Sequence, residues 1–251
     1  MSRAIVCLLC LFAPAAGAIV NMEGLHLESP PPGWSGSGDL AFSGNEGNTR
    51  TLNLDAALRL RWRRDPVTRF LVASQSYGES RGIKARDRSF LHLRHIRQVR
   101  PRRAREAFVQ LERDAFARLR LRALAGGGLR LTLATSDRRT ALLGLGAFYS
   151  RERLSDGASG EDLDYGQWRG NLYLILRHRW DEHRRAWLTG YLQPDLVAPE
   201  DLRATATAGM ATDLGRHWQM NWQVDYTFDS RPPRSVGRYD LTYRAGFTRR
   251  F

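Results

Sequence analysis

The stretch YDLTYRAGFTRRF, residues 239–251, ends the chain and decides the fold class, because its side chains alternate between two kinds. One face carries Tyr239, Leu241, Tyr243, Ala245, Phe247, Arg249 and Phe251, and the other carries Asp240, Thr242, Arg244, Gly246, Thr248 and Arg250. A period of two is the pattern of a β-strand with one apolar and one polar side. The stretch WQMNWQVDYTFD, residues 218–229, repeats it. The chain therefore ends in two strands with aromatic-rich apolar faces, which could pack on a soluble core or face lipid.

The composition limits the environments and partners to consider. Charged residues make up 26% of the 251 residues, and the mean hydropathy is −0.46. These values do not argue against a membrane barrel, because a barrel strand shows lipid only every second residue. The net charge is +13, and Lys84 is the only lysine among the basic residues. Such a basic chain is suited to nucleic acid or to an anionic membrane surface.

The N-terminus indicates export. Arg3 is followed by an apolar run at residues 4–12 and by Ala-Gly-Ala at 16–18, the pattern of a cleaved signal peptide. Cleavage there removes Cys7 and Cys10, so that neither a disulfide nor thiol chemistry is expected in the mature chain. The lipoprotein alternative is disfavoured because the residue before Cys10 is a bulky leucine. Export also disfavours nucleic acid as a partner.

The sequence divides into three parts. We expect a signal peptide at residues 1–18, a proline-bearing tether without periodicity at 19–33, and one β-barrel domain at 34–251. No other apolar run is long enough for a spanning helix, which needs about 20 residues.

Twelve strand patterns are expected in the barrel domain. They lie at residues 34–43, 51–63, 69–77, 87–99, 104–113, 119–133, 141–151, 168–179, 185–193, 202–214, 218–229 and 239–251. Residues 104–125 also fit a helix, because Phe108, Leu111, Ala115 and Leu119 have helical spacing. We favour strands there, since Gly126–Gly128 would interrupt a helix but can lie in a curved strand.

The connections between these strands are predicted to alternate in length. The longer ones fall at 44–48, 78–86, 152–164, 194–200 and 230–238, and most of the others are tight turns. Long loops on one rim, short turns on the other and an even strand number are typical of an outer-membrane barrel. A soluble β-sandwich has no reason to sort its connections in this way.

The tryptophans give a second indication of a membrane barrel. Trp34, Trp62, Trp180, Trp187 and Trp218 are expected near the short-turn rim, with Trp168 near the other. Aromatic girdles at the bilayer interfaces predict this clustering.

Several short motifs resemble one known family. They are WSGSG at 34–38, GNEGNT at 44–49, EAFVQ at 106–110, GGGL at 126–129, GAFY at 146–149 and the terminal Phe251. Together they resemble the family of salt-induced outer-membrane proteins, a domain of unknown function. The resemblance covers nearly all of the mature chain and implies a β-barrel in the Gram-negative outer membrane. It implies no catalytic residues, because the family has no established chemistry.

No catalytic, cofactor or metal site is expected, and we predict that the protein is not an enzyme. His92 and His95 are three residues apart, so that on a strand they point to opposite faces and cannot share a metal. The enzymatic alternative is a lipid-active outer-membrane enzyme with a serine–histidine site, for which His95 with Ser74 or Ser76 is conceivable.

The polar faces of the strands predict a charged lumen. If the apolar faces meet lipid, the lumen receives Arg59, Arg61, Arg120, Arg122, Arg130, Arg169, Arg177, Arg179, Arg244, Asp39, Asp55, Asp225 and Asp240. One hypothesis is an acidic seam opposite an arginine wall, which would favour anions in a narrow passage. The alternative is that these charges pair across a packed lumen and fill it.

Loop arginines could also meet lipopolysaccharide phosphates at the outer surface, by charge-assisted pairing. The candidates are Arg81, Arg86, Arg151, Arg153, Arg231 and Arg234. Solvated rim charge is an equally good interpretation of them.

The last strand also predicts how the barrel is assembled. We expect residues 239–251 to pair with residues 34–43 and close the barrel. Tyr243, Phe247 and Phe251 resemble the C-terminal signal that the barrel-assembly machinery recognises.

Three functions remain open after this reading. They are a monomeric outer-membrane barrel with a passive pore or envelope-integrity role, a lipid-active enzyme, and a secreted soluble β-protein that binds an anionic ligand.

Overall fold

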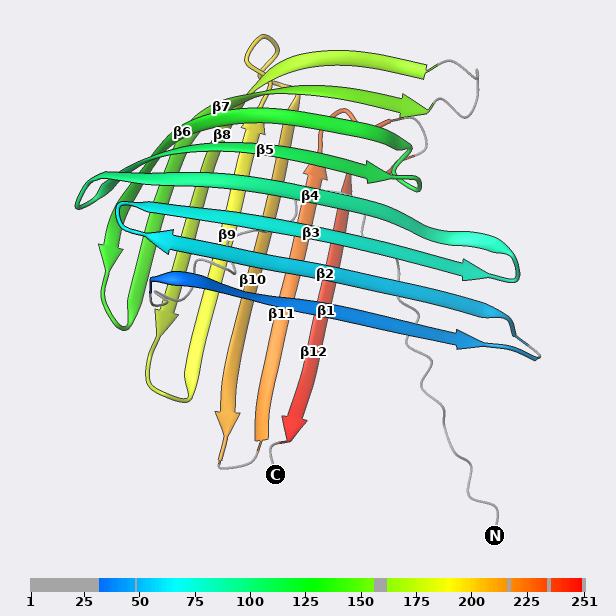
Figure 1. Ribbon diagram of the computed structural model, residues 1–251, viewed down its shortest axis with the longest axis horizontal. Helices are drawn as coiled ribbons and strands as arrows, with labels where there is room; N and C mark the ends of the chain where they lie inside the picture. Colours follow the sequence, from blue (N-terminus) through cyan, green and yellow to red (C-terminus); the bar gives the residue numbers. More distant parts are fainter. Residues whose placement is uncertain (1–31, 48, 156–161, 216–217, 234–235, 250–251) are drawn as a thin grey trace.

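The computed structural model describes residues 32–47, 49–155, 162–215, 218–233 and 236–249. The predicted signal peptide, nearly all of the predicted tether, Arg234 and Phe251 lie outside these residues. The described chain forms one sheet of twelve strands, and every strand is antiparallel to its neighbours in sequence order (Figure 1). The predicted all-β, up-and-down fold with twelve strands is therefore confirmed. The described residues include no helix that is long and apolar enough to cross a membrane.

The strands are long and the connections between them are short. Their bounds are β1 Gly33–Asn45, β2 Thr51–Arg64, β3 Val67–Ser80, β4 Ile83–Arg100, β5 Arg103–Asp114, β6 Leu119–Thr135, β7 Arg139–Ser155, β8 Asp162–Arg179, β9 Arg184–Pro194, β10 Leu202–Leu214, β11 Trp218–Asp229 and β12 Tyr239–Arg249. The strand interpretation of residues 104–125 is confirmed, because β5 and β6 cover this stretch with only a four-residue connection between them.

Two rims follow from the up-and-down order. The long-loop rim carries the connections that follow the odd-numbered strands, and the short-turn rim carries those that follow the even-numbered strands. One predicted loop is wrong: β3 runs to Ser80 and β4 starts at Ile83, so that residues 78–86 are mostly strand. Arg81 and Gly82 both adopt positive φ there and make a two-residue hairpin turn.

β5 shows most clearly how the two faces of the sheet differ. Ala104, Glu106, Phe108, Gln110, Glu112 and Asp114 are buried, and the residues between them are exposed. We call the buried side the inner face and the other side the outer face. The same alternation continues through the neighbouring strands, so that the sheet has one continuous inner face.

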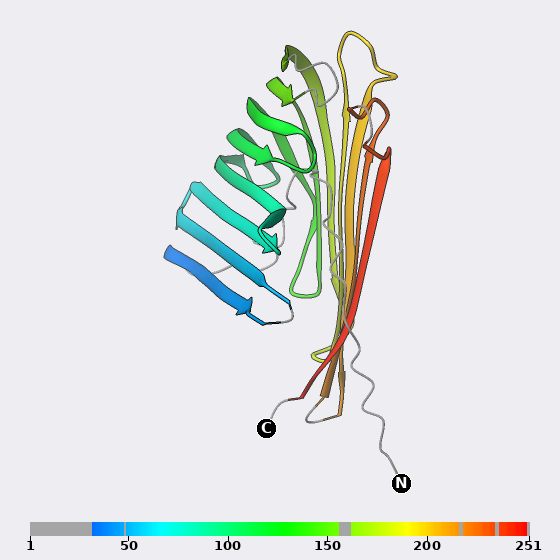
Figure 2. The same ribbon diagram turned by 90° about the vertical axis from the view of Figure 1, so that its right-hand side faces the viewer.

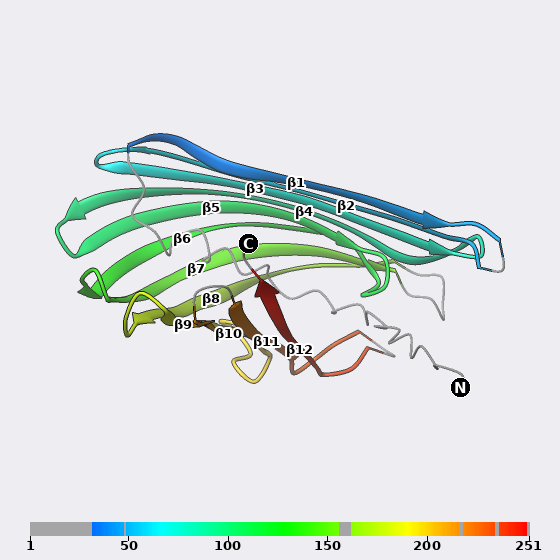
Figure 3. The same ribbon diagram turned by 90° about the horizontal axis from the view of Figure 1, so that it is seen from below.

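The sheet curves strongly toward its inner face. In Figure 2 the first strands and the last strands stand opposite each other across an interior, and in Figure 3 the first eight strands arch over it. Glycines permit the close approach of backbones in the curved part. A Cβ atom on Gly128 would lie 2.3 Å from the carbonyl oxygen of Leu145, and one on Gly146 would lie 2.3 Å from that of Gly127. The prediction that Gly126–Gly128 lie in a curved strand is confirmed, since they lie within β6.

The expected pairing of the first and last strands is not seen. Within the described residues β1 pairs with β2 and β12 pairs with β11, and the sheet order has two ends. β1 is rich in glycine and serine, and it offers no large inner side chain that could pack against β12.

The tryptophans partly follow the expected girdle. Trp34 and Trp62 stand directly opposite each other near the short-turn rim, and Trp180 and Trp218 lie at turns of that rim. Trp187 differs, because it lies on the inner face, where a Cβ atom on Gly209 would be only 2.2 Å from its ring. Gly209, which stands opposite Trp187, has no side chain and so leaves room for the indole on the inner face.

Candidate functional site: an ion-pair network on the inner face

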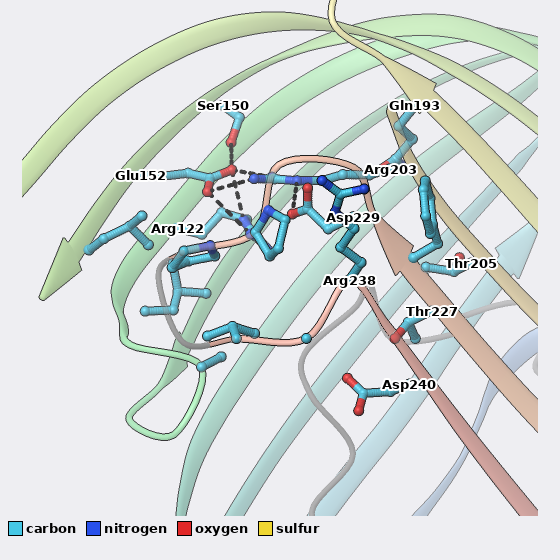
Figure 4. A pocket seen from close by; sticks show the side chains of 18 of the residues that line it. Arg122, Ser150, Glu152, Gln193, Arg203, Thr205, Thr227, Asp229, Arg238 and Asp240 are labelled. Carbon is cyan, nitrogen blue, oxygen red and sulfur yellow. Dashed lines mark hydrogen bonds and ion pairs between the residues drawn. The ribbon is translucent and has the colours of Figure 1, made fainter. Parts of the chain in front are cut away.

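Glu152, on β7, is the centre of a buried polar network near the long-loop rim (Figure 4). Its side chain is fully buried. Arg122 donates from Nε and Nη2 to the two carboxylate oxygens, at 3.0 and 3.2 Å. Arg203 donates to the same two oxygens from Nη1 and Nη2. The hydroxyls of Ser150 and Tyr165 each donate to the carboxylate at 3.1 Å, so that all its lone pairs are engaged.

The network continues on both sides of Glu152 as a row of alternating charges. Arg122 also reaches Glu112 of β5 at 3.2 Å, and Glu112 accepts from Arg88 of β4 at 3.0 Å. On the other side, Arg203 donates to Asp229 of β11 at 3.0 Å. Since β7 and β10 are not neighbours in the sheet, the contact between Arg203 and Glu152 crosses the interior.

A second cluster lies deeper, around Glu106. Tyr173 of β8 donates its hydroxyl to Glu106 at 2.9 Å, and Arg130 pairs with the same carboxylate at 3.2 Å. Arg130 Nε also donates to the Tyr173 hydroxyl at 2.8 Å. The ring of Tyr173 covers Gly144, where a Cβ atom would lie 1.9 Å from it. The glycine is therefore needed for the tyrosine to reach across to β5.

The structure places most of the expected lumen charges on the inner face. Arg122, Arg130 and Arg169 are buried there. Arg59 pairs with Asp39 at 2.7 Å. Arg61 donates to Ser35, Arg177 donates to Thr140, and the exposed Arg179 donates to the backbone of Asp137. Asp55 pairs with Arg86 at 2.6 Å, and Asp225 with Arg244 at 2.8 Å. Asp240 lines a cavity next to Glu152.

Arg120 lies differently from the expectation. The register of β6 shifts between Leu119 and Leu121, so that Leu119 is buried and Arg120 is exposed at the bulge. An extra residue at a bulge breaks the strict alternation on which the expectation depended.

The sequence reasoning missed several buried carboxylates, of which Glu106, Glu112 and Glu152 belong to these two clusters. The separation of acids from arginines is therefore not found, because these acids stand among the arginines and pair with them. Glu106 and Glu112 are an even number of residues apart on β5, so a strand places them on the same face as the buried Phe108. The helical spacing of residues 104–125 obscured this pattern.

The serine–histidine alternative has no geometric support. His95 lies on the outer face and accepts from Arg69 Nε at 3.4 Å, whereas Ser76 lies on the inner face and donates to Asp55. In the register of β3 and β4, Ser74 stands opposite Phe90 rather than a histidine. His92 is buried between Phe90 and Phe108 and contacts Gln110 at 3.0 Å. No group of metal-binding side chains is found within the described ranges.

The arginines expected to meet lipopolysaccharide are largely neutralised within the chain. Arg151 and Arg153 both pair with Asp164, at 3.0 and 3.1 Å. Arg231 pairs with Glu200 at 2.9 Å, and Arg86 pairs with Asp55 at 2.6 Å.

A cavity of about 80 Å³ adjoins the network beneath the β11–β12 connection. Its lining includes Leu154, Phe228, Pro232, Pro233 and Arg238. Its volume suits a few water molecules rather than an organic substrate. The carboxylate of Glu152 already accepts four groups of donors, so that the arrangement braces the interior rather than offering a free acid or base.

Comparison with known proteins gives a family and distant structural likenesses. A family model described as "Protein of unknown function, DUF481" matches residues 38–251. No curated protein matches the sequence. The CymD monoaromatic hydrocarbon channel is similar with a TM-score of 0.44 and 11% identity, over 95% of this chain and 86% of that one. The translocator domain of the autotransporter NalP from Neisseria meningitidis is similar with a TM-score of 0.43 and 13% identity, over 91% and 92%.

Proposed function

This chain belongs to the DUF481 family, and we propose that it is an integral outer-membrane β-barrel protein with an envelope-integrity role. In this proposal the outer face meets lipid, and the ion pairs of the inner face hold the barrel wall together.

The observation that carries the proposal is that the inner face buries carboxylates while large apolar side chains lie exposed on the outer face. Glu112 and Glu152 are 1% and 0% exposed, whereas Leu129 and Leu133 are 51% and 52% exposed. Soluble proteins bury apolar side chains and leave carboxylates in water. Such exposure suits a surface that lies in the hydrocarbon of a bilayer.

The apolar surface is continuous from strand to strand. Leu60 stands opposite Leu71, Leu71 opposite Leu93, and Leu93 opposite Val109 on the outer face. On the other half of the sheet, Leu145 stands opposite Leu172, which stands opposite Leu192. Exposed apolar patches of this extent mark an interaction surface.

The braced interior supports a structural role more than a standing pore. Arg203 with Glu152, and Tyr173 with Glu106, link strands that are not neighbours in the sheet, through side chains that project from the inner face. The second possible role is a passive pore. It would need an open path for solutes through the interior beside these contacts. The free edges of β1 and β12 would have to be covered in a bilayer, because an unpaired backbone group costs several kcal/mol there. Closure of β1 on β12 is therefore part of the proposal.

The proposal includes a route and partners but no catalysis. The predicted signal peptide would bring the chain to the periplasm, and the barrel-assembly machinery would recognise the C-terminal strand with Tyr243 and Phe247. Both side chains are well exposed, at 75% and 65%. Outer-membrane lipids, with lipopolysaccharide on the long-loop side, are the expected surroundings.

Single-channel recording in planar bilayers tests the role. We expect purified, heat-modifiable protein to insert and to show no steady conductance at moderate voltage. The matched variant Arg203→Ala removes the contact that crosses the interior and should show transient conductance. A steady, ohmic conductance of the wild type would replace the structural role by a pore.

A further inference from the structure

Most of the net charge of the chain lies at the short-turn rim. The segments 61–69, 97–105, 135–139 and 177–185, which form four of its turns, carry fifteen arginines and four acidic residues. Fifteen minus four leaves +11 of the net +13 of the whole chain. The charge that made the sequence basic is therefore concentrated at one end of the sheet.

The β4–β5 turn shows why this charge is unusual. Arg97 stands directly opposite Arg105, and Arg100 stands opposite Arg103. All four side chains are exposed, as is Arg102 in the turn itself. Within the part of the chain that the structure describes, none of the five forms an ion pair. Like charges directly opposite on adjacent strands are destabilising, and an anion between them would reverse the sign of that interaction.

The surroundings of the turn suit a ligand with an apolar part. The lining of a groove beside the turn includes Pro66, His95, Arg97, Val99, Arg105 and Ala107. Beyond Ala107, the outer face of β5 continues with Val109 and Leu111, both 47% exposed. A ligand whose anionic group lies at the arginines could therefore lay its apolar part along Val109 and Leu111.

Tryptophans mark the same level of the sheet. Trp34 is 75% exposed and stands opposite Trp62. The guanidinium of Arg69 lies 5.0 Å from the centre of the Trp62 ring. Tryptophan rings beside basic groups are typical of the headgroup level of a membrane.

We propose that the arginine rim, defined as Arg97, Arg100, Arg102, Arg103 and Arg105, docks on anionic phospholipid headgroups of the leaflet that the short turns face. The inference rests on the proposed membrane location. Headgroup phosphates separate the opposed guanidinium groups, and the acyl chains lie along Val109 and Leu111.

Lipid selectivity of the reconstituted full-length protein tests this docking. The protein is placed in phosphatidylcholine bilayers that contain spin-labelled phosphatidylglycerol or spin-labelled phosphatidylcholine, and the immobilised fraction of each probe is measured. We expect wild type to prefer phosphatidylglycerol by at least about threefold, with the preference weakened in 1 M salt. The variant R97Q/R100Q/R102Q/R103Q/R105Q should lose most of it.

The control variant R81Q/R86Q/R151Q/R153Q/R231Q removes the same number of charges at the long-loop rim and should keep the preference. An equal preference in wild type and in the arginine-rim variant would overturn the inference, and so would an equal loss in both variants. Binding of a soluble oligonucleotide through the five arginines, without any lipid preference, would also overturn it. Failure of the wild type to insert into any bilayer, scored by heat-modifiable migration, would instead contradict the proposed function.

Discussion

The two rims of the sheet use arginine in opposite ways. At the long-loop rim, arginines stand directly opposite acids: Arg88 opposite Asp114, Arg122 opposite both Glu112 and Glu152, Arg153 opposite Asp164, and Arg203 opposite Asp229. At the short-turn rim, arginines stand opposite arginines: Arg97 opposite Arg105, Arg100 opposite Arg103, and Arg179 opposite Arg185. At the short-turn rim Arg63 and Arg184 also pair with acids, at 3.0 and 2.6 Å, but the opposed arginines form no ion pair among the described residues. Arginine therefore braces the interior at one end, and in our proposal the opposed arginines at the other end dock on anionic lipid.

The largest predicted effect tests the braced rim. Glu152→Ala leaves Arg122 and Arg203 buried without their shared carboxylate, and we expect it to lower the free energy of unfolding by about 3–5 kcal/mol. Urea unfolding in phosphatidylcholine vesicles, followed by tryptophan fluorescence, measures this loss.

The matched control for this prediction is Asp164→Ala. This aspartate pairs with two arginines at the same rim, but their side chains are 61% and 56% exposed. An exposed pair contributes about 0–1 kcal/mol. Equal losses in the two variants would show that burial does not distinguish the network.

An intermediate effect is expected from Gly144→Ala. The added methyl group would overlap the ring of Tyr173, which would have to leave Glu106 and Arg130, and we expect a loss of about 1–3 kcal/mol. The control Gly190→Ala adds the same methyl group where the nearest atom is 3.8 Å away. The same unfolding assay compares them, and a Gly144→Ala protein as stable as the control would contradict the position of Tyr173.

The smallest effect should differ in sign between the rims. Arg97→Gln removes one of two opposed arginines, so that stability in zwitterionic lipid should rise by about 0.2–1 kcal/mol. Arg153→Gln removes a partner of Asp164 and should lower stability by up to about 1 kcal/mol. The comparison of the rims fails if both variants shift the urea midpoint in the same direction.

Much of the fold followed from the sequence, because the period of two is a local property. The alternation in residues 218–229 and 239–251 predicted β11 and β12, and the glycines at 126–128 favoured strands where the apolar spacing also fitted a helix. The turn at Arg81 and Gly82 was missed, because charge and glycine content indicate a loop while two residues with positive φ suffice for a hairpin.

The site was less predictable because it depends on contacts between distant strands. The alternation assigned Arg122 and Arg130 to the inner face, but nothing local shows that Arg203 reaches Glu152 across the interior. The number of charges does not show which residues stand opposite each other. Only the register of β4 and β5 shows that Arg97 stands opposite Arg105 rather than opposite an acid. A single bulge was enough to move Arg120 away from its expected place.

A spin-label scan along the outer face of β5 tests the central claim most directly, which is that this face lies in lipid with the arginine rim at headgroup depth. Single cysteines replace Arg103, Arg105, Ala107, Val109 and Leu111 in turn, and collisions with oxygen and with a water-soluble nickel complex are measured in bilayers. We predict high nickel accessibility at 103 and 105, and high oxygen with low nickel accessibility at 107, 109 and 111. High nickel accessibility at all five positions would place the outer face in water and would contradict the membrane barrel.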